Sequence, residues 1–267
     1  MKVELSLTER NATVNPTAHI DKRVKLSAGC VIGQNVQIHG KVSIDKNVWV
    51  DSNVIIYGPI DIDSGTYLGP NSILGFPERQ ELRNILLKRT LDPKLKNGKP
   101  TKIGKNVMIR SNCVVYSGVI IGDNVRFGHN VMVRENVKIG EDSTVGTNSV
   151  IDGSCKIGRK ASIQTGVYVS TYTTVEDNVF LGPCCSLIND LYLAQKKYEL
   201  KGPTIKNGAS IGANSTIFPA ITIGEGAVVG AGAVVREDVP SRVVVVGVPA
   251  KKLKDVPEDW HIQGSLS

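Results

Sequence analysis

The sequence is poor in aromatic residues and shows no paired cysteines, and each shortage narrows what the protein can be. Aromatic residues make up 5% of the 267 positions, while Val, Ile and Gly are abundant, which fits a core of stacked β-branched side chains. The five cysteines, an odd number, have neither paired nor metal-like spacing. We therefore predict a reduced, cytoplasmic protein. We find no signal peptide and no apolar run of membrane length, so we expect no membrane partner.

Basic stripes interleaved with aromatic residues are also missing, and we therefore expect no nucleic-acid partner. The net charge is nevertheless +7, and the surplus is concentrated in two stretches, 76–102 and 190–206. Solvated charged loops would explain this concentration. The alternative is that these stretches meet a polyanionic small molecule.

What the sequence does have is a period of six. An aliphatic or aromatic residue returns at every sixth position from Ile103 to Leu187, and the same frame holds from Val14 to Leu74 and from Ile205 to Val235. Helical spacing and strict strand alternation both fail to give this period. A six-residue repeat is typical of a parallel β-helix with three hexads in each triangular coil. The sequence therefore predicts an all-β fold.

Two further positions of the hexad support the same fold. Cys30, Cys113, Cys155 and Cys185 occur four residues after a repeat aliphatic, where we expect them to be buried as small hydrophobic residues. Polar residues recur at the corners, where Asn tolerates a left-handed backbone; they are Asn106, Asn112, Asn124, Asn130, Asp142, Asn148 and Asn178. For Asn130 a second role in binding stays open.

The interruptions of the period divide the chain. We expect an N-terminal β-helix over 1–75, a helix and loop insert over 76–102, a main β-helix over 103–240 with a loop at 189–203, and a C-terminal extension over 241–267. Pro77 and Glu78 favour a helix start. The insert would be either a spacer or a substrate-binding segment in which Arg83 and Arg89 grip a diphosphate through forked hydrogen bonds.

The hexads, the loop after Asn189-Asp190 and the ending Gly247-Val248-Pro249-Ala250-Lys251 together resemble the hexapeptide-repeat acyltransferases. Within that family, the stretch from Glu176 to Pro183 followed by Asn189-Asp190 is similar to the enzymes that acetylate nucleotide-linked amino sugars. Two β-helices in one chain resemble the N-acetyltransferases of dTDP-3-amino-3,6-dideoxyhexoses, which serve surface-glycan biosynthesis.

The resemblance implies a left-handed coil and a homotrimer with active sites in the clefts between subunits. It also implies acetyl-CoA as co-substrate, with no metal. Its pantetheine is expected near Gly182, Ala213 and Ala231, and its phosphates near Arg236, Lys251 and Lys252. One departure is that Tyr172-Thr173-Thr174 stands where shorter relatives carry a Tyr-Glu-Gly turn, which puts any role of that glutamate in doubt.

His129 is the candidate catalytic residue. It lies at an outward corner beside Asn130 and six residues before Glu135, and an imidazole can accept the proton that an attacking amine must shed. Glu135 or Asp190 would orient the amine or hold the imidazole, and a backbone amide near Gly182 would stabilise the oxyanion. We assign substrate binding to Asn130, Glu135, Asn189, Asp190, Arg83 and Arg89.

Other readings stay open at this point. The departing thiolate could take the proton without a protein base, and His129 could be an idle surface residue. An O-acetyltransferase acting on a sugar or serine would share the scaffold. A hexapeptide carbonic anhydrase needs three histidines around a metal, and the sequence offers no second histidine near His129. A lipid A type acyltransferase would normally end in a helical domain, which this sequence lacks. The non-enzymatic alternative is a purely structural β-helix, which would bind no acetyl-CoA.

Overall fold

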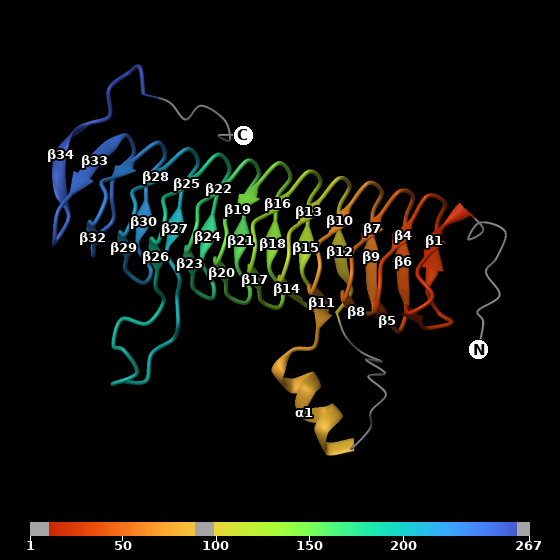
Figure 1. Cartoon of the computed structure of the whole chain (residues 1–267). Coiled ribbons are helices and arrows are strands. Elements are labelled where there is room, and N and C mark those ends of the chain that lie inside the picture. The colour runs from red at the N-terminus through yellow and green to blue at the C-terminus, as the bar shows by residue number, and fades with distance from the viewer. Residues whose placement is uncertain (1–10, 89–98, 261–267) are drawn as a thin grey trace. The chain divides into compact units, whose positions relative to one another are not determined.

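The computed structural model describes residues 11–88 and 99–260, which form two compact units divided between Asn136 and Val137. Each unit is a β-solenoid, in which strands of two to five residues stack on one another coil by coil (Figure 1). The prediction of an all-β parallel solenoid with hexapeptide repeats is confirmed.

The first unit has three parallel sheets. The first sheet contains β1 (Thr13–Val14), β4 (Val31–Ile32), β7 (Trp49–Val50), β10 (Tyr67–Leu68), β13 (Met108–Ile109) and β16 (Arg126–Phe127). The second contains β2 (His19–Ile20), β5 (Gln37–His39), β8 (Ile55–Tyr57), β11 (Ile73–Phe76), β14 (Val114–Tyr116) and β17 (Met132–Val133). The third contains β3 (Lys25–Leu26), β6 (Val42–Ile44), β9 (Ile60–Ile62), β12 (Thr101–Ile103) and β15 (Ile120–Ile121).

The second unit repeats this plan. Its first sheet contains β19 (Thr144–Val145), β22 (Ser162–Ile163), β25 (Phe180–Leu181), β28 (Ser210–Ile211), β31 (Val228–Val229), β33 (Val243–Val246) and β34 (Lys251–Asp255). Its second contains β20 (Val150–Ile151), β23 (Tyr168–Val169), β26 (Ser186–Leu187), β29 (Thr216–Ile217) and β32 (Val234–Val235). Its third contains β18 (Lys138–Ile139), β21 (Lys156–Ile157), β24 (Thr174–Val175), β27 (Thr204–Ile205) and β30 (Thr222–Ile223). The last described strand, β34, pairs with β33 in the antiparallel direction.

The core of each unit consists of the residues that the period of six singles out. From Ile103 to Leu187 every sixth residue is buried, and Phe127 is the largest side chain that is fully buried. Burying one such side chain stabilises the fold by roughly 1.5–3 kcal/mol. Val14 and Ile20 are only half-buried, because they lie in the first described coil and have a described coil on one side only.

The corners confirm the predicted backbone. All seven predicted corner residues have a positive φ, between 53° and 60°. The same conformation recurs at Asn35, Asn53 and Asn71, whose side-chain amides form a ladder with hydrogen bonds of 3.2 and 3.1 Å. Asn suits these positions because a left-handed backbone costs other residues roughly 1–2 kcal/mol.

The insert contains the helix α1 (Arg79–Lys88), the one α-helix of the described residues. The sheets continue past the insert, because β12 pairs directly with β9 through Thr101 and Ile60. At the start of α1, the Glu81 carboxylate accepts hydrogen bonds from the Glu78 amide at 3.0 Å and from the Ser117 hydroxyl at 3.2 Å. The helix is therefore attached to the solenoid at its first turn, from which it projects (Figure 1). Over the described ranges, no helix has the length and apolar character that a membrane span requires.

Candidate functional site

His129 lies at an exposed corner that follows β16. Its Nδ1 is 2.7 Å from the hydroxyl oxygen of Ser111, which occupies the same corner one coil earlier. The two corners are also joined through the backbone, because the Asn130 amide donates to the Ser111 carbonyl at 3.0 Å. Asn130, the predicted neighbour, is exposed and has a φ of 55°.

Ser111 is a residue that the sequence reasoning missed. The signal was available, since Ser111 precedes His129 by 18 residues and three hexads make one coil. Counting back by one coil from a candidate base finds the side chain stacked upon it.

Glu135 follows β17 and is half-buried. Both of its carboxylate oxygens accept hydrogen bonds from the Arg134 guanidinium, at 3.0 and 2.9 Å. The guanidinium carbon of Arg134 in turn lies 5.3 Å from the centre of the Tyr116 ring, which is the geometry of a cation–π contact. The carboxylate of Glu135 is thus fixed in position by a neighbour that sequence reasoning did not single out.

Tyr116 is the last ring of an aromatic row in the first unit. Phe76 lies 5.1 Å from Tyr116 and 6.5 Å from Tyr57, both edge-on, and His39 stacks on Tyr57 at 5.5 Å. Each ring belongs to the last residue of its strand, and the four strands are successive members of the second sheet. They hold the Arg134–Glu135 pair at the end of a rigid, half-buried row.

Of the two arginines expected to bind a diphosphate, Arg83 lies on α1 with its side chain exposed. Arg89 lies outside the described residues.

In the second unit, Asn189 and Asp190 lie together where the loop 189–203 leaves β26. The Asn189 side-chain amide donates to the Thr171 carbonyl at 3.2 Å. The Asp190 carboxylate accepts from the Tyr192 amide at 2.9 Å and from the Ala194 amide at 2.8 Å. Both side chains therefore shape the base of the loop.

The loop itself carries exposed apolar side chains, including Leu191 and Leu193. Tyr192 and Tyr198 pack edge-on with ring centres 5.4 Å apart, and the Lys196 ammonium lies 5.0 Å from the Tyr192 ring. The loop is consequently an ordered projection built around Asp190 and Tyr192.

The residues expected to contact pantetheine lie on successive coils along one corner. Gly182 follows β25, Ala213 comes just after β28, and Ala231 just after β31. A Cβ atom on Gly182 would come within 2.7 Å of the Ala213 amide nitrogen, so the coils approach closely there because no side chain intervenes. The Gly182 amide donates to the Ile211 carbonyl at 2.8 Å. An oxyanion donor near Gly182 would therefore have to be another amide.

The residues expected to meet phosphates come from two places. Arg236 follows β32, and its guanidinium carbon lies 5.4 Å from the Phe218 ring centre. Lys251 and Lys252 begin β34 and are exposed. The Lys252 ammonium is 2.6 Å from the Asp255 carboxylate, which partly offsets its charge.

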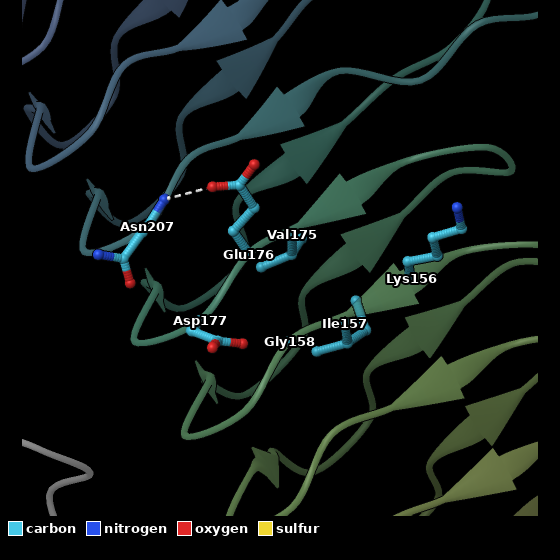
Figure 2. A pocket seen from close by; sticks show the side chains of 7 residues that line it. All are labelled: Lys156, Ile157, Gly158, Val175, Glu176, Asp177 and Asn207. Carbon is cyan, nitrogen blue, oxygen red and sulfur yellow. Dashed lines mark hydrogen bonds between the residues drawn. The ribbon is translucent and has the colours of Figure 1, made fainter.

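A groove of about 380 Å³ lies on the third sheet of the second unit (Figure 2). Its lining consists of Lys156, Ile157, Gly158, Val175, Glu176, Asp177 and Asn207, which include none of the predicted site residues. Glu176 accepts from the Asn207 amide at 3.0 Å and from the Lys206 ammonium at 2.8 Å. Arg159 binds Asp177, which lowers the pKa of that carboxyl. The charged groups of this groove are therefore largely paired with one another.

Among the described residues, no group of three or more His, Cys, Asp or Glu side chains is arranged to hold a metal ion.

Comparison with known proteins points to one family. The model of the family described as bacterial transferase hexapeptide (six repeats) matches residues 100–135, 119–153, 136–171 and 202–237. Serine acetyltransferase of Buchnera aphidicola is 37% identical over 95 residues, which are 34% of this chain and 32% of the relative. Galactoside O-acetyltransferase of Escherichia coli is 34% identical over 101 residues, which are 35% of this chain and 50% of the relative.

A further relative is named as an N-acetyltransferase. The 2,3,4,5-tetrahydropyridine-2,6-dicarboxylate N-acetyltransferase of Clostridium perfringens is 54% identical over 54 residues, which are 20% of this chain and 23% of the relative. The chain thus spans half or less of the length of these relatives. Like the hexads and the solenoid, the matches show that parts of this chain are similar to the hexapeptide-repeat acyltransferases.

Proposed function

We propose that the protein transfers an acetyl group from acetyl-CoA to the amino group of a nucleotide-linked amino sugar. The preferred acceptor is a dTDP-3-amino-3,6-dideoxyhexose used in surface-glycan biosynthesis. The observation that carries acetyl transfer is the match to the hexapeptide transferase family, together with relatives that are themselves acetyltransferases. The amino-sugar acceptor rests on the stretch from Glu176 to Pro183 with Asn189-Asp190, and on the basic insert that carries Arg83.

In the proposed reaction, the amine nitrogen forms a bond to the thioester carbonyl carbon and the carbon–sulfur bond breaks. The proton lost by the amine passes to the imidazole of His129 and then to the departing thiolate. The exposed corner of His129 and its hydrogen bond to Ser111 support this role, because the ring is both accessible and oriented. In the rival mechanism, the thiolate takes the proton directly.

We assign the acceptor to Asn130, Glu135, Asn189, Asp190, Arg83 and Arg89. The donor is assigned to the corner of Gly182, Ala213 and Ala231, where close-packed coils with little side-chain bulk suit an extended pantetheine arm. Arg236, Lys251 and Lys252 would attract its phosphates. The assembly is proposed to be a homotrimer in the cytoplasm, with acetyl-CoA as co-substrate and no metal.

The test is an assay of thiol release from acetyl-CoA with a panel of dTDP- and UDP-linked amino sugars. His129→Asn should lower kcat by about 10²–10⁴, the usual contribution of a general base. His19→Asn changes an exposed histidine on β2 and should leave kcat unchanged. A loss below about tenfold in His129→Asn would contradict the base mechanism and favour proton transfer to the thiolate.

O-acetylation is the second candidate, because the Escherichia coli relative is a galactoside O-acetyltransferase. Pairs of nucleotide sugars that carry either a hydroxyl or an amine at the same carbon separate the two activities. If acetyl-CoA produces no thermal shift at any concentration, both activities fail and a structural role for the solenoid remains.

A further inference from the structure

Ser111 and His129 are held together by the architecture of the coil. Each residue directly precedes a corner asparagine with a left-handed backbone, Asn112 at a φ of 60° and Asn130 at 55°. The Asn130 amide donates to the Ser111 carbonyl, so the two corners are fixed one above the other. The backbone therefore stacks the two side chains, and their rotamers bring the Ser111 hydroxyl oxygen to 2.7 Å from His129 Nδ1.

The two carboxylates that the sequence suggests as partners of the imidazole, Glu135 and Asp190, bind other groups. Both carboxylate oxygens of Glu135 accept hydrogen bonds from Arg134, and Asp190 binds the amides of Tyr192 and Ala194. The Ser111 hydroxyl oxygen, in contrast, lies 2.7 Å from Nδ1 of the ring.

We propose that Ser111 is a positioning residue that orients the His129 ring and selects its tautomer, accepting a hydrogen bond from Nδ1–H so that the lone pair resides on Nε2. This inference rests on the proposed role of His129 as base. A neutral imidazole has one donor and one acceptor nitrogen, so the partner of one nitrogen decides what the other presents. When Nε2 takes the proton of the amine, the Nδ1 donor becomes part of a cation and its hydrogen bond to Ser111 strengthens.

An uncharged serine is suited to this task. Its hydroxyl oxygen can accept a hydrogen bond from Nδ1–H both before and after the ring becomes charged, because its lone pairs are independent of its own proton. The oxygen therefore remains a partner of the ring throughout the reaction, while the corner backbone keeps the ring in place.

The kinetic test compares Ser111→Ala with Ser111→Thr. The alanine variant should lower kcat by about tenfold with each KM within about twofold, because only ring orientation is lost. The threonine variant should restore most of kcat, since it keeps the hydroxyl and the equivalent hexad position holds Thr147 and Thr165 elsewhere in the chain. Ser111→Ala with full kcat, in a protein that His129→Asn inactivates, would overturn the proposal.

Ser52→Ala is the matched control. Ser52 occupies the equivalent corner of an earlier coil, is half-buried like Ser111, and its carbonyl likewise accepts the amide of the asparagine in the next coil, Asn71. It should leave kcat unchanged. Equal melting temperatures of the two alanine variants would show that lost activity in Ser111→Ala is not lost folding.

A spectroscopic test does not depend on the proposed reaction. In protein labelled with ¹⁵N-histidine, four ring systems are visible, and His129 is assigned by its disappearance in His129→Asn. The nitrogen shifts at high pH should show protonated Nδ1 and unprotonated Nε2, and Ser111→Ala should shift the ring towards the opposite tautomer. A protonated Nε2 in the unaltered protein, or an unchanged tautomer in Ser111→Ala, overturns the proposal. If no sugar is acetylated, the proposed function fails while this measurement still decides the role of Ser111.

Discussion

At the scale of single residues, short polar side chains inside the coils follow one rule. Ser143, Ser149 and Ser215 each donate to the carbonyl 15 residues later, at 2.9, 2.9 and 3.0 Å. The thiols of Cys113 and Cys155 make the corresponding contact at 3.3 and 3.0 Å. At these positions the cysteine thiol donates the same hydrogen bond as the serine hydroxyl. Burial also raises the pKa of the Cys113 thiol to about 11 and that of Cys155 to about 12, so both remain protonated near neutral pH.

This rule predicts that Cys155→Ser is tolerated. The hydroxyl can donate to the Ser170 carbonyl as the thiol does, so the free energy of unfolding should change by less than about 1 kcal/mol. Cys155→Ala removes the donor and leaves a small void, and it should cost about 1 kcal/mol more. Urea unfolding measures both, with the exposed Cys184→Ser as a control. A serine variant less stable than the alanine variant would show that the buried hydroxyl does not form the hydrogen bond that the thiol forms.

At the scale of elements, the loop 189–203 has to hold its own shape outside the coil. Leu193 and Ala194 both have a positive φ, 51° and 62°. The Asp190 carboxylate stabilises this turn by accepting the amides on either side of Leu193. Asp190 is therefore a structural residue of the loop as well as a proposed substrate contact.

Two variants of Asp190 separate these roles. Asp190→Ala removes both acceptors, so the loop should open more often and trypsin should cut at Lys196 or Lys197 several-fold faster. Asp190→Asn keeps one acceptor oxygen and should be cut at nearly the original rate, while KM for the acceptor rises if the negative charge binds the amine. Equal cleavage of Asp190→Ala and the unaltered protein would show that the aromatic pair Tyr192–Tyr198 suffices to hold the turn.

At the scale of the whole molecule, most of the fold could be predicted, because a solenoid repeats one local rule. Each repeat aliphatic faces the interior, and each corner asparagine adopts a left-handed backbone conformation. The positions of Ile109 and Asn124 therefore follow from counting alone. Of the candidate site, the sequence singles out His129, and counting back by one coil places Ser111 beside it. The hydrogen bonds of Ser111 to His129 and of Arg134 to Glu135 could not be predicted. Such side-chain contacts depend on rotamers, which the period of six does not specify.

The stability of the folded protein should also decrease at acidic pH. Hydrogen bonds from Arg159 hold the pKa of Asp177 below its ordinary value, and Arg23 does the same for Asp21. A carboxyl whose pKa is lowered in the folded state contributes stability above its unfolded pKa of about 3.9, and that contribution disappears as the pH falls through the lower folded value. The melting temperature should therefore fall as the pH drops below about 4.

Asp177→Asn should have a lower melting temperature than the unaltered protein at pH 7, and the difference should shrink towards pH 2. Asp259→Asn, at an exposed position outside both pairs, controls for loss of a negative charge. A difference for Asp177→Asn that stays constant from pH 7 to pH 2 would show that the Asp177 side chain stabilises the coil through packing rather than through its charge.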